Sequence, residues 1–232
     1  MRTSAALLLS VFLIAVSAAP AFASVPETTA AGIPLDAPWK VKIYELAHTK
    51  FLHPAWGWQH SERDYLLAVE LAKGDHLKID TDVLFAAAFL HDMSAFMPCE
   101  DKKMEHGECA ATQAKNMLEG TGFPMQKLAA VQQAERGHMY YSNPGRDPTA
   151  IVLHDADSLD FLGAIGAARI MALTGAQVPS FAPAVKTLNG FLKDIPPSLI
   201  TNTAKRMGAV RVAQLKAFLD NLRQETFDGR AM

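Results

Sequence analysis

Apolar side chains recur every three to four residues over most of the chain, which is the spacing of amphipathic helices. The spacing predicts a first helix over residues 39–52, on the positions Val41, Tyr44, Ala47 and Phe51. Residues 61–64 (Ser-Glu-Arg-Asp) resemble a capping box and predict that a second helix starts there and ends at Gly74. The run from Val83 to Leu90 is apolar on all sides, which is typical of a buried helix.

The third helix is expected to start at Asp80 or Thr81 and to end at His91-Asp92. Further helices are predicted over residues 105–119, 124–136, 147–173, 182–192 and 203–224. No segment alternates between apolar and polar residues with a period of two, so no sheet is predicted. The sequence therefore predicts one all-α helical bundle over residues 39–226, preceded by a linker over 24–38 and followed by a tail over 227–232.

Composition and charge narrow the class of protein. The chain is 50% apolar and 20% charged, with 14 Gly and 13 Pro in 232 residues, as is usual for a globular protein. Its formal net charge of −2 provides no broad positive field, so we expect no nucleic-acid polymer as a partner.

The N-terminal stretch has the features of a secretion signal. Arg2 precedes the apolar run Ala5–Ala18, and Ala21-Phe22-Ala23 has the small-x-small pattern of a cleavage site. The alternative is a membrane anchor, but the run is short for a span of about 20 residues and no basic cluster follows it. We therefore expect residues 1–23 to be a signal peptide, and the mature protein to be periplasmic or secreted without stable membrane insertion.

Four histidines and an aspartate fall at or near the ends of four successive predicted helices, and a second aspartate lies within the fifth, so that they can converge. The set comprises His60, His91, Asp92, His106, His138 and Asp157. Imidazoles and carboxylates together suit Mn, Fe, Co, Ni or Zn as divalent ions. Asp92 also follows a wholly apolar helix, where burial of an uncompensated carboxylate would be costly. The alternative for any single histidine is a hydrogen-bonded side chain at a helix end.

The order of these motifs resembles a known family. Gln-His60-Ser-Glu-Arg, Ala-Phe-Leu-His91-Asp92, Glu-His106-Gly-Glu, Gly-His138 and Asp155-Ala-Asp157-Ser-Leu-Asp160 follow one another along the chain. This order is similar to that of the HD-domain metal-dependent phosphohydrolase superfamily, in particular its small bacterial branch with an Asp-Ala-Asp-x-Leu-Asp motif. The resemblance implies an all-α HD domain with His60, His91, Asp92 and Asp157 as metal ligands and Asp155 just behind them.

The resemblance implies a hydrolase that takes a small phosphorylated substrate, a phosphoester or a nucleotide. One or two divalent transition ions would activate water for the attack. Asp92 would then be catalytic and bridge two ions, and His106 and His138 would be either further ligands or a general acid and phosphate donors. The candidate phosphate-binding side chains are Arg63, Lys103 and Arg136, each of which is also a common solvated surface residue. Ser158 stands where the branch usually has arginine, which removes a cation beside the site.

Two other functions use the same residues. HD-fold mixed-valent di-iron oxygenases have a His, His-Asp, His, His, Asp set in this order. A non-catalytic protein that binds a metal or another ligand would also contain the same residues. Two bound irons with an oxygen-dependent colour change would favour the oxygenase, whereas metal-stimulated release of p-nitrophenol would favour hydrolysis.

Cys99 and Cys109 are the only two cysteines of the chain. In an oxidising compartment such a pair favours a disulfide, and the loop between them is short enough to fold back. The alternative is two buried, reduced thiols.

Overall fold

The computed structural model describes residues 26–174 and 180–232, so the signal peptide expected over residues 1–23 lies outside the described part. Helices make up the regular structure of the described residues, and their only β-type pairing is an isolated bridge between Thr28 and Pro34. The prediction of an all-α fold is therefore confirmed. No helix among these residues is long and apolar enough to cross a membrane.

Nine α-helices follow one another in the described residues. They are α1 (Pro38–Lys50), α2 (Trp58–Gly74), α3 (Thr81–Leu90), α4 (His106–Leu118), α5 (Leu128–Gly137), α6 (Pro148–Asp160), α7 (Gly163–Thr174), α8 (Ala182–Asp194) and α9 (Asn202–Glu225). Short 3-10 helices lie between them at Met93–Ala95, Met125–Lys127 and Pro196–Ser198.

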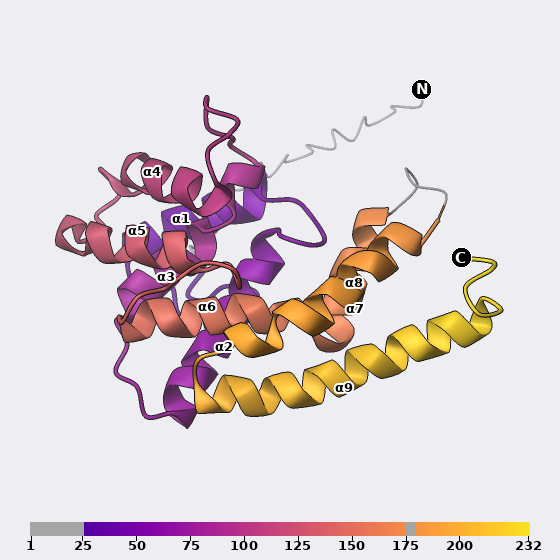
Figure 1. The fold of residues 1–232 in the computed structure, drawn as a ribbon. Helices are drawn as coiled ribbons and strands as arrows, with labels where there is room; N and C mark the ends of the chain where they lie inside the picture. Colours follow the sequence, from indigo (N-terminus) through magenta and orange to yellow (C-terminus); the bar gives the residue numbers. More distant parts are fainter. Residues whose placement is uncertain (1–25, 175–179) are drawn as a thin grey trace, which may run out of the picture.

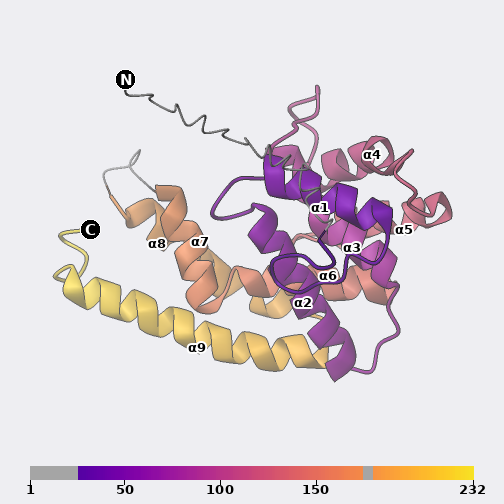
Figure 2. The same ribbon diagram turned by 180° about the vertical axis from the view of Figure 1, so that it is seen from behind.

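Helix α3 lies at the centre of the first part of the fold, in contact with α1, α2, α5 and α6 (Figure 1). All residues from Val83 to Leu90 are buried, as the apolar run predicts. On the other side of the molecule, α7 and α8 contact each other and the long helix α9, as Figure 2 shows from behind. Helices α2 and α6 join the two parts, because α6 contacts α2, α3, α5, α7 and α9.

Side chains that precede the helices fix where several of them start. The carboxylate of Asp80 accepts hydrogen bonds from the backbone N–H groups of Asp82 and Val83, and Asp147 does the same at the start of α6. The hydroxyl of Thr201 accepts a hydrogen bond from the N–H of Ala204 at the start of α9. These bonds satisfy N–H groups that have no partner within the helix.

Three helix boundaries differ from the prediction. Helix α2 starts at Trp58 and not near Ser61, which is buried inside the helix, so the expected capping box is wrong. The segment predicted as one helix over 147–173 is divided into α6 and α7, with Gly163 at a φ of +71° that suits glycine. The segment predicted as a helix over 124–136 begins with a 3-10 turn at Met125–Lys127.

Part of the segment expected to be a linker over 24–38 contributes to the core. Ile33 is 1% exposed, and Leu35 is buried beside it. The backbone N–H of Ala31 donates to the carboxylate of Glu62 on α2, at 2.9 Å. Ile33, Leu35 and the backbone of Ala31 thus attach this otherwise largely exposed segment to the bundle.

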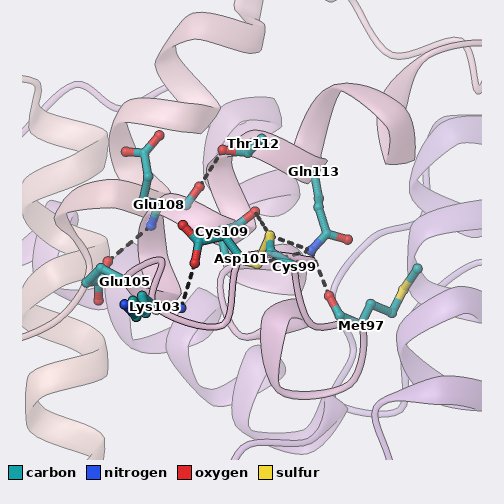
Figure 3. Close-up of a disulfide and its surroundings, with 9 residues drawn as sticks. All are labelled: Met97, Cys99, Asp101, Lys103, Glu105, Glu108, Cys109, Thr112 and Gln113. Atoms are coloured by element: carbon teal, nitrogen blue, oxygen red, sulfur yellow. Dashed lines mark hydrogen bonds between the residues drawn. A yellow bond between two sulfur atoms is a disulfide. The ribbon is translucent and has the colours of Figure 1, made fainter.

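A disulfide closes the loop that leads into α4. Cys99 lies in the loop and Cys109 in the first turns of α4, with their sulfur atoms 2.08 Å apart (Figure 3). The side-chain amide of Gln113 donates to the carbonyl oxygen of Met97 at 2.7 Å and lies within 3.3 Å of both sulfur atoms. Because His106 is inside the ring, the bond restrains the start of the helix that carries it.

We predict that the unreduced protein, unfolded in denaturant, contains no free thiol and that two thiols appear after reduction. On the chain-entropy model the 11-residue ring stabilises the fold by about 3 kcal/mol. The double variant Cys99→Ala/Cys109→Ala should therefore unfold at a lower urea concentration than the wild type. Two free thiols in the unreduced protein would contradict the bond.

Candidate metal centre

Five helices bring their ends together around one point. His60 is in the first turn of α2, and His91-Asp92 follow the last residue of α3. His106 is the first residue of α4, and His138 follows the last residue of α5. Asp157 lies in the last turn of α6. The six side chains of the expected ligand set are thus brought together, although they span almost 100 residues of sequence.

A first group of donors is closed off from solvent. We call His60, Asp64, His91 and Asp157 the buried donor group; each is at most 1% exposed. The Nε2 atom of His60 is 3.1 Å from Asp64 Oδ2, 3.2 Å from His91 Nε2 and 3.3 Å from Asp157 Oδ1. One donor atom from each of the four residues lies within 4.8 Å of every other, which is a separation that one metal ion can span.

A second group of donors has two members, Asp92 and His106, that line a cavity, and a third, His138, that is buried behind them. We call Asp92, His106 and His138 the cavity-side group. Asp92 Oδ1 is 3.2 Å from His106 Nε2, which is 2.8 Å from His138 Nε2. The other oxygen of Asp92 is 3.4 Å from Nε2 of both His60 and His91. Asp92 therefore touches both groups, as a carboxylate that bridges two ions would.

Hydrogen bonds orient three of the histidines toward the common point. The Nδ1 atom of His60 lies 2.8 Å from Asp160 Oδ2, that of His91 3.0 Å from the carbonyl oxygen of Ala88, and that of His138 2.5 Å from the carbonyl oxygen of Glu135. Carboxylates and carbonyls only accept, so Nδ1 carries the proton in each ring. In the neutral ring Nε2 then has a free lone pair directed into the cluster, which is the arrangement of a metal-ligating histidine.

His154 provides the contrast within the second His-Asp pair. Its Nδ1 and Nε2 atoms lie 2.9 Å and 3.3 Å from the carbonyl oxygens of Gly137 and Ser198. Its neighbour Asp155 accepts from the backbone N–H groups of Ile200 and Thr201, at 2.9 and 2.8 Å. Asp155 therefore joins α6 to the segment before α9, and its expected place just behind the ligands is wrong.

Asp160 is the residue that holds the centre from behind. Besides His60, it binds the guanidinium of Arg169 at 3.0 Å and that of Arg63 at 2.8 Å. Arg169 is 2% exposed; it also donates to the carbonyl oxygen of Ala55 and lies over the ring of Phe161. Burial opposes the charge of Asp160, but His60 and the two arginines hold its pKa well below the ordinary value.

The pKa shifts indicate that the centre requires positive charge. Burial alone would lower the pKa of His60 and His91, but the surrounding carboxylates raise it, to about 9 for His91. Burial and the nearby His91 lower the pKa of His138 to about 4, and burial raises that of Asp64 to about 7. Without a cation, protons on the first two histidines would offset the carboxylates.

Buried oxygen atoms without a hydrogen-bond donor show that the residues present fit a metal ion. Within the buried donor group they are both carboxylate oxygens of Asp64 and Oδ2 of Asp157; the others among the described residues belong to Glu135 and Ser158. A buried carboxylate oxygen without a partner is costly unless a cation binds it. Asp64 was not among the predicted ligands, although its position four residues after His60, on the same face of α2, is a signal that the sequence contains.

The arginines and the lysine expected to bind phosphate are engaged or exposed elsewhere. Arg63 binds Asp160 behind the centre, and Arg136 pairs at the surface with Glu108, at 2.6 Å. Lys103 is exposed in the disulfide-bonded loop, where its backbone N–H donates to Asp101. The structure thus brings none of the three into the cavity described next.

A cavity of about 370 Å³ opens beside the cavity-side group. Asp92, His106 and Arg169 are its ionisable lining residues, and the remaining wall is mainly aromatic and aliphatic. Its lining residues are Trp56, Asp92, Ala95, His106, Met139, Tyr140, Phe161, Arg169, Ile170, Leu173, Thr187 and Phe191. The rings of Phe161 and Phe191 lie 4.9 Å apart, and that of Tyr140 lies 5.9 Å from Phe191.

The donor residues of this centre all lie in a segment that is similar to a known domain family. Residues 57–162 match the family model described as HD domain. No curated protein matches the chain.

Solved structures resemble about four fifths of the chain. Bacillus subtilis YpgQ in complex with ADP has a TM-score of 0.61 at 19% identity, covering 80% of this chain and 97% of that one. A protein from Lactobacillus plantarum has a TM-score of 0.61 at 24% identity, with 81% and 96% covered. A predicted HD superfamily hydrolase from an uncultured Thermotogales bacterium has a TM-score of 0.58 at 25% identity, with 82% and 94% covered.

We predict that Asp160→Asn lowers the free energy of unfolding by about 3 kcal/mol, because it leaves the buried guanidinium of Arg169 without its anionic partner. Urea denaturation measures the loss. The matched control is Glu108→Gln, which breaks an exposed arginine pair and should cost less than about 1 kcal/mol. Equal losses in the two variants would contradict the central role of Asp160.

Proposed function

We propose that this chain, whose residues 57–162 match the HD-domain family model, is a metal-dependent hydrolase of small phosphoesters. The observation that carries the proposal is the convergence of four histidines and three carboxylates beside a cavity whose far end is apolar. Such an arrangement suits the transfer of a phosphoryl group from an organic molecule to water.

His60, Asp64, His91, Asp92, His106, His138 and Asp157 are the residues that would hold one or two divalent transition ions. A bound ion of this kind supplies Lewis acidity and lowers the pKa of water toward neutrality. The two donor groups share Asp92, which supports two adjacent ions.

His106 is the group of this centre best suited to move a proton. Its side chain is 35% exposed, whereas His60, His91 and His138 are buried. It also lines the cavity, next to Asp92. We assign it the delivery of a proton to the leaving oxygen of the substrate when it does not bind an ion.

The cavity supports a substrate with an apolar or aromatic organic group. Phe161, Phe191 and Tyr140 would contact a flat ring, while the phosphate would lie at the end formed by Asp92 and His106. A nucleotide fits this description, and YpgQ has been crystallised with ADP. A simple aryl phosphate fits it equally well.

We also propose that the protein acts outside the cytoplasm. The signal features of residues 1–23 support this location, and so does the bond between Cys99 and Cys109, because disulfides persist in oxidising compartments.

The alternative function is that of a di-iron oxygenase, and one observation favours it: Asp92 contacts histidines of both donor groups. Iron content and colour change under oxygen distinguish the two. Two irons with an oxygen-dependent absorption band, together with no phosphatase activity under any divalent ion, would replace hydrolysis by oxygenation.

We predict that the purified protein releases p-nitrophenol from p-nitrophenyl phosphate when Mn²⁺ or Co²⁺ is added after chelation. Asp92→Ala should abolish this release and reduce the amount of bound metal, because Asp92 serves both donor groups. The exposed carboxylate Asp228 provides the control, since Asp228→Ala should leave both quantities unchanged. Full metal content and activity in Asp92→Ala would overturn the assignment.

A second prediction concerns the aromatic wall. Phe191→Ala should raise KM for p-nitrophenyl phosphate about tenfold with little change in kcat, because it removes apolar contact with the organic group. The matched control is Phe218→Ala, a partly buried phenylalanine on α9 outside this cavity. An unchanged KM in Phe191→Ala would exclude the wall from substrate binding.

A further inference from the structure

Two buried carboxylates in the described part of the chain, those of Asp64 and Glu135, have no hydrogen-bond donor on either oxygen, and Asp64 is the one that belongs to the buried donor group. It lies on α2, one helical turn after His60, and its side chain is fully buried. Neither of its carboxylate oxygens receives a hydrogen bond. The nearest ring nitrogens are Nε2 of His60 at 3.1 Å and Nε2 of His91 at 3.6 Å.

Those two nitrogens cannot satisfy Asp64 in their neutral forms. The proton of His60 is on Nδ1, bound to Asp160, and that of His91 is on Nδ1, bound to the Ala88 carbonyl. In these neutral forms, lone pairs of both Nε2 atoms would face a carboxylate oxygen. Such a contact is repulsive unless a cation or an additional proton lies between the atoms.

The geometry favours a cation. Donor atoms of Asp64, His60, His91 and Asp157 all lie within 4.8 Å of one another, and Asp157 also has an oxygen without a donor. One ion would bind the lone pairs of both histidines and both unsatisfied carboxylates, whereas protons on the two rings would leave Asp64 Oδ1 and Asp157 Oδ2 without a partner.

We propose that Asp64 is a direct ligand of a divalent transition ion held by the buried donor group. The ligand set implied by the motifs (His60, His91, Asp92 and Asp157) does not contain it. The proposal rests on the metal centre of the proposed function but not on hydrolysis. Asp64 gives the buried position a carboxylate of its own, in addition to Asp157 and to Asp92, which both donor groups share.

The proposal has a signature that a structural carboxylate would not give. In the absence of metal, a ligand carboxylate at this position is an unsatisfied buried charge, so Asp64→Asn should raise the melting temperature of the chelator-treated protein. The same variant should lose most of the thermal stabilisation that Co²⁺ gives the wild type. If the carboxylate were instead needed for folding, Asp64→Asn would lower the melting temperature of the chelator-treated protein and leave the stabilisation by Co²⁺ unchanged.

The test is titration of the metal-free full chain with Co²⁺, followed by calorimetry and by the visible d–d absorption bands, which report the number of ligands. Asp64→Asn should bind the first ion roughly 100-fold more weakly, with a changed spectrum. The matched control is Glu62→Gln on the same helix, a buried carboxylate that accepts the N–H of Ala31 and faces away from the centre. It should show the affinity and spectrum of the wild type.

Wild-type affinity and spectrum in Asp64→Asn would overturn the proposal. So would a variant that fails to fold without metal, because the carboxylate would then be structural. A wild-type protein that takes up no ion would instead overturn the proposed function itself, so the two failures are distinguishable.

Discussion

The carboxylate of Asp160 holds together parts of the chain that are far apart in sequence. It receives the Nδ1 proton of His60 and the guanidinium groups of Arg63 and Arg169, and Arg169 reaches on to the carbonyl oxygen of Ala55. The direction of the His60 ring depends on this contact, and the lone pair that the ring offers to the centre depends on that direction. One buried anion thus links the packing of α2, α6 and α7 to the chemistry in front of it.

The centre places repulsive groups together, which is the opposite of what stability alone would favour. Unpaired buried carboxylates lower the stability of a fold, and natural proteins retain such groups mainly at functional sites. Here the cost is offset by a large apolar core around α3, whose residues from Val83 to Leu90 are all buried. The all-α frame is therefore stable enough to carry an electrostatically unfavourable site at the ends of its helices.

The sequence predicted what depends on local pattern. Helical spacing located most of the helices, and the positions of His60, His91, Asp92, His106 and His138 at or near helix ends indicated that they can converge. Asp157 lay inside a predicted helix, and the resemblance to the HD-domain motif placed it with them. The break at Gly163 was missed because both sides of it continue the apolar periodicity. Asp64 was missed because it was interpreted as part of a capping box, although its spacing from His60 pointed to the same face.

Contacts between distant residues were beyond sequence reasoning. Arg136 lies in the last turn of α5, two residues before His138, which suggested a role at the centre. Its partner is instead Glu108 on α4, 28 residues away. Asp155 lies in the same motif as Asp157, two residues before it, yet it accepts hydrogen bonds from the backbone N–H groups of residues 200 and 201. The partner that each carboxylate binds depends on how the helices pack, and no local sequence pattern encodes that packing.

The separation of the donors into a buried group and a cavity-side group also has a kinetic consequence. Asp92 and His106 line the cavity, whereas His60, Asp64, His91 and Asp157 have almost no exposed surface. An ion in the inner position would have to leave past Asp92, so it would exchange with the medium far more slowly than an ion in the outer position. Brief dialysis against a chelator would then empty the outer position first, and the inner ion would behave as a fixed part of the fold.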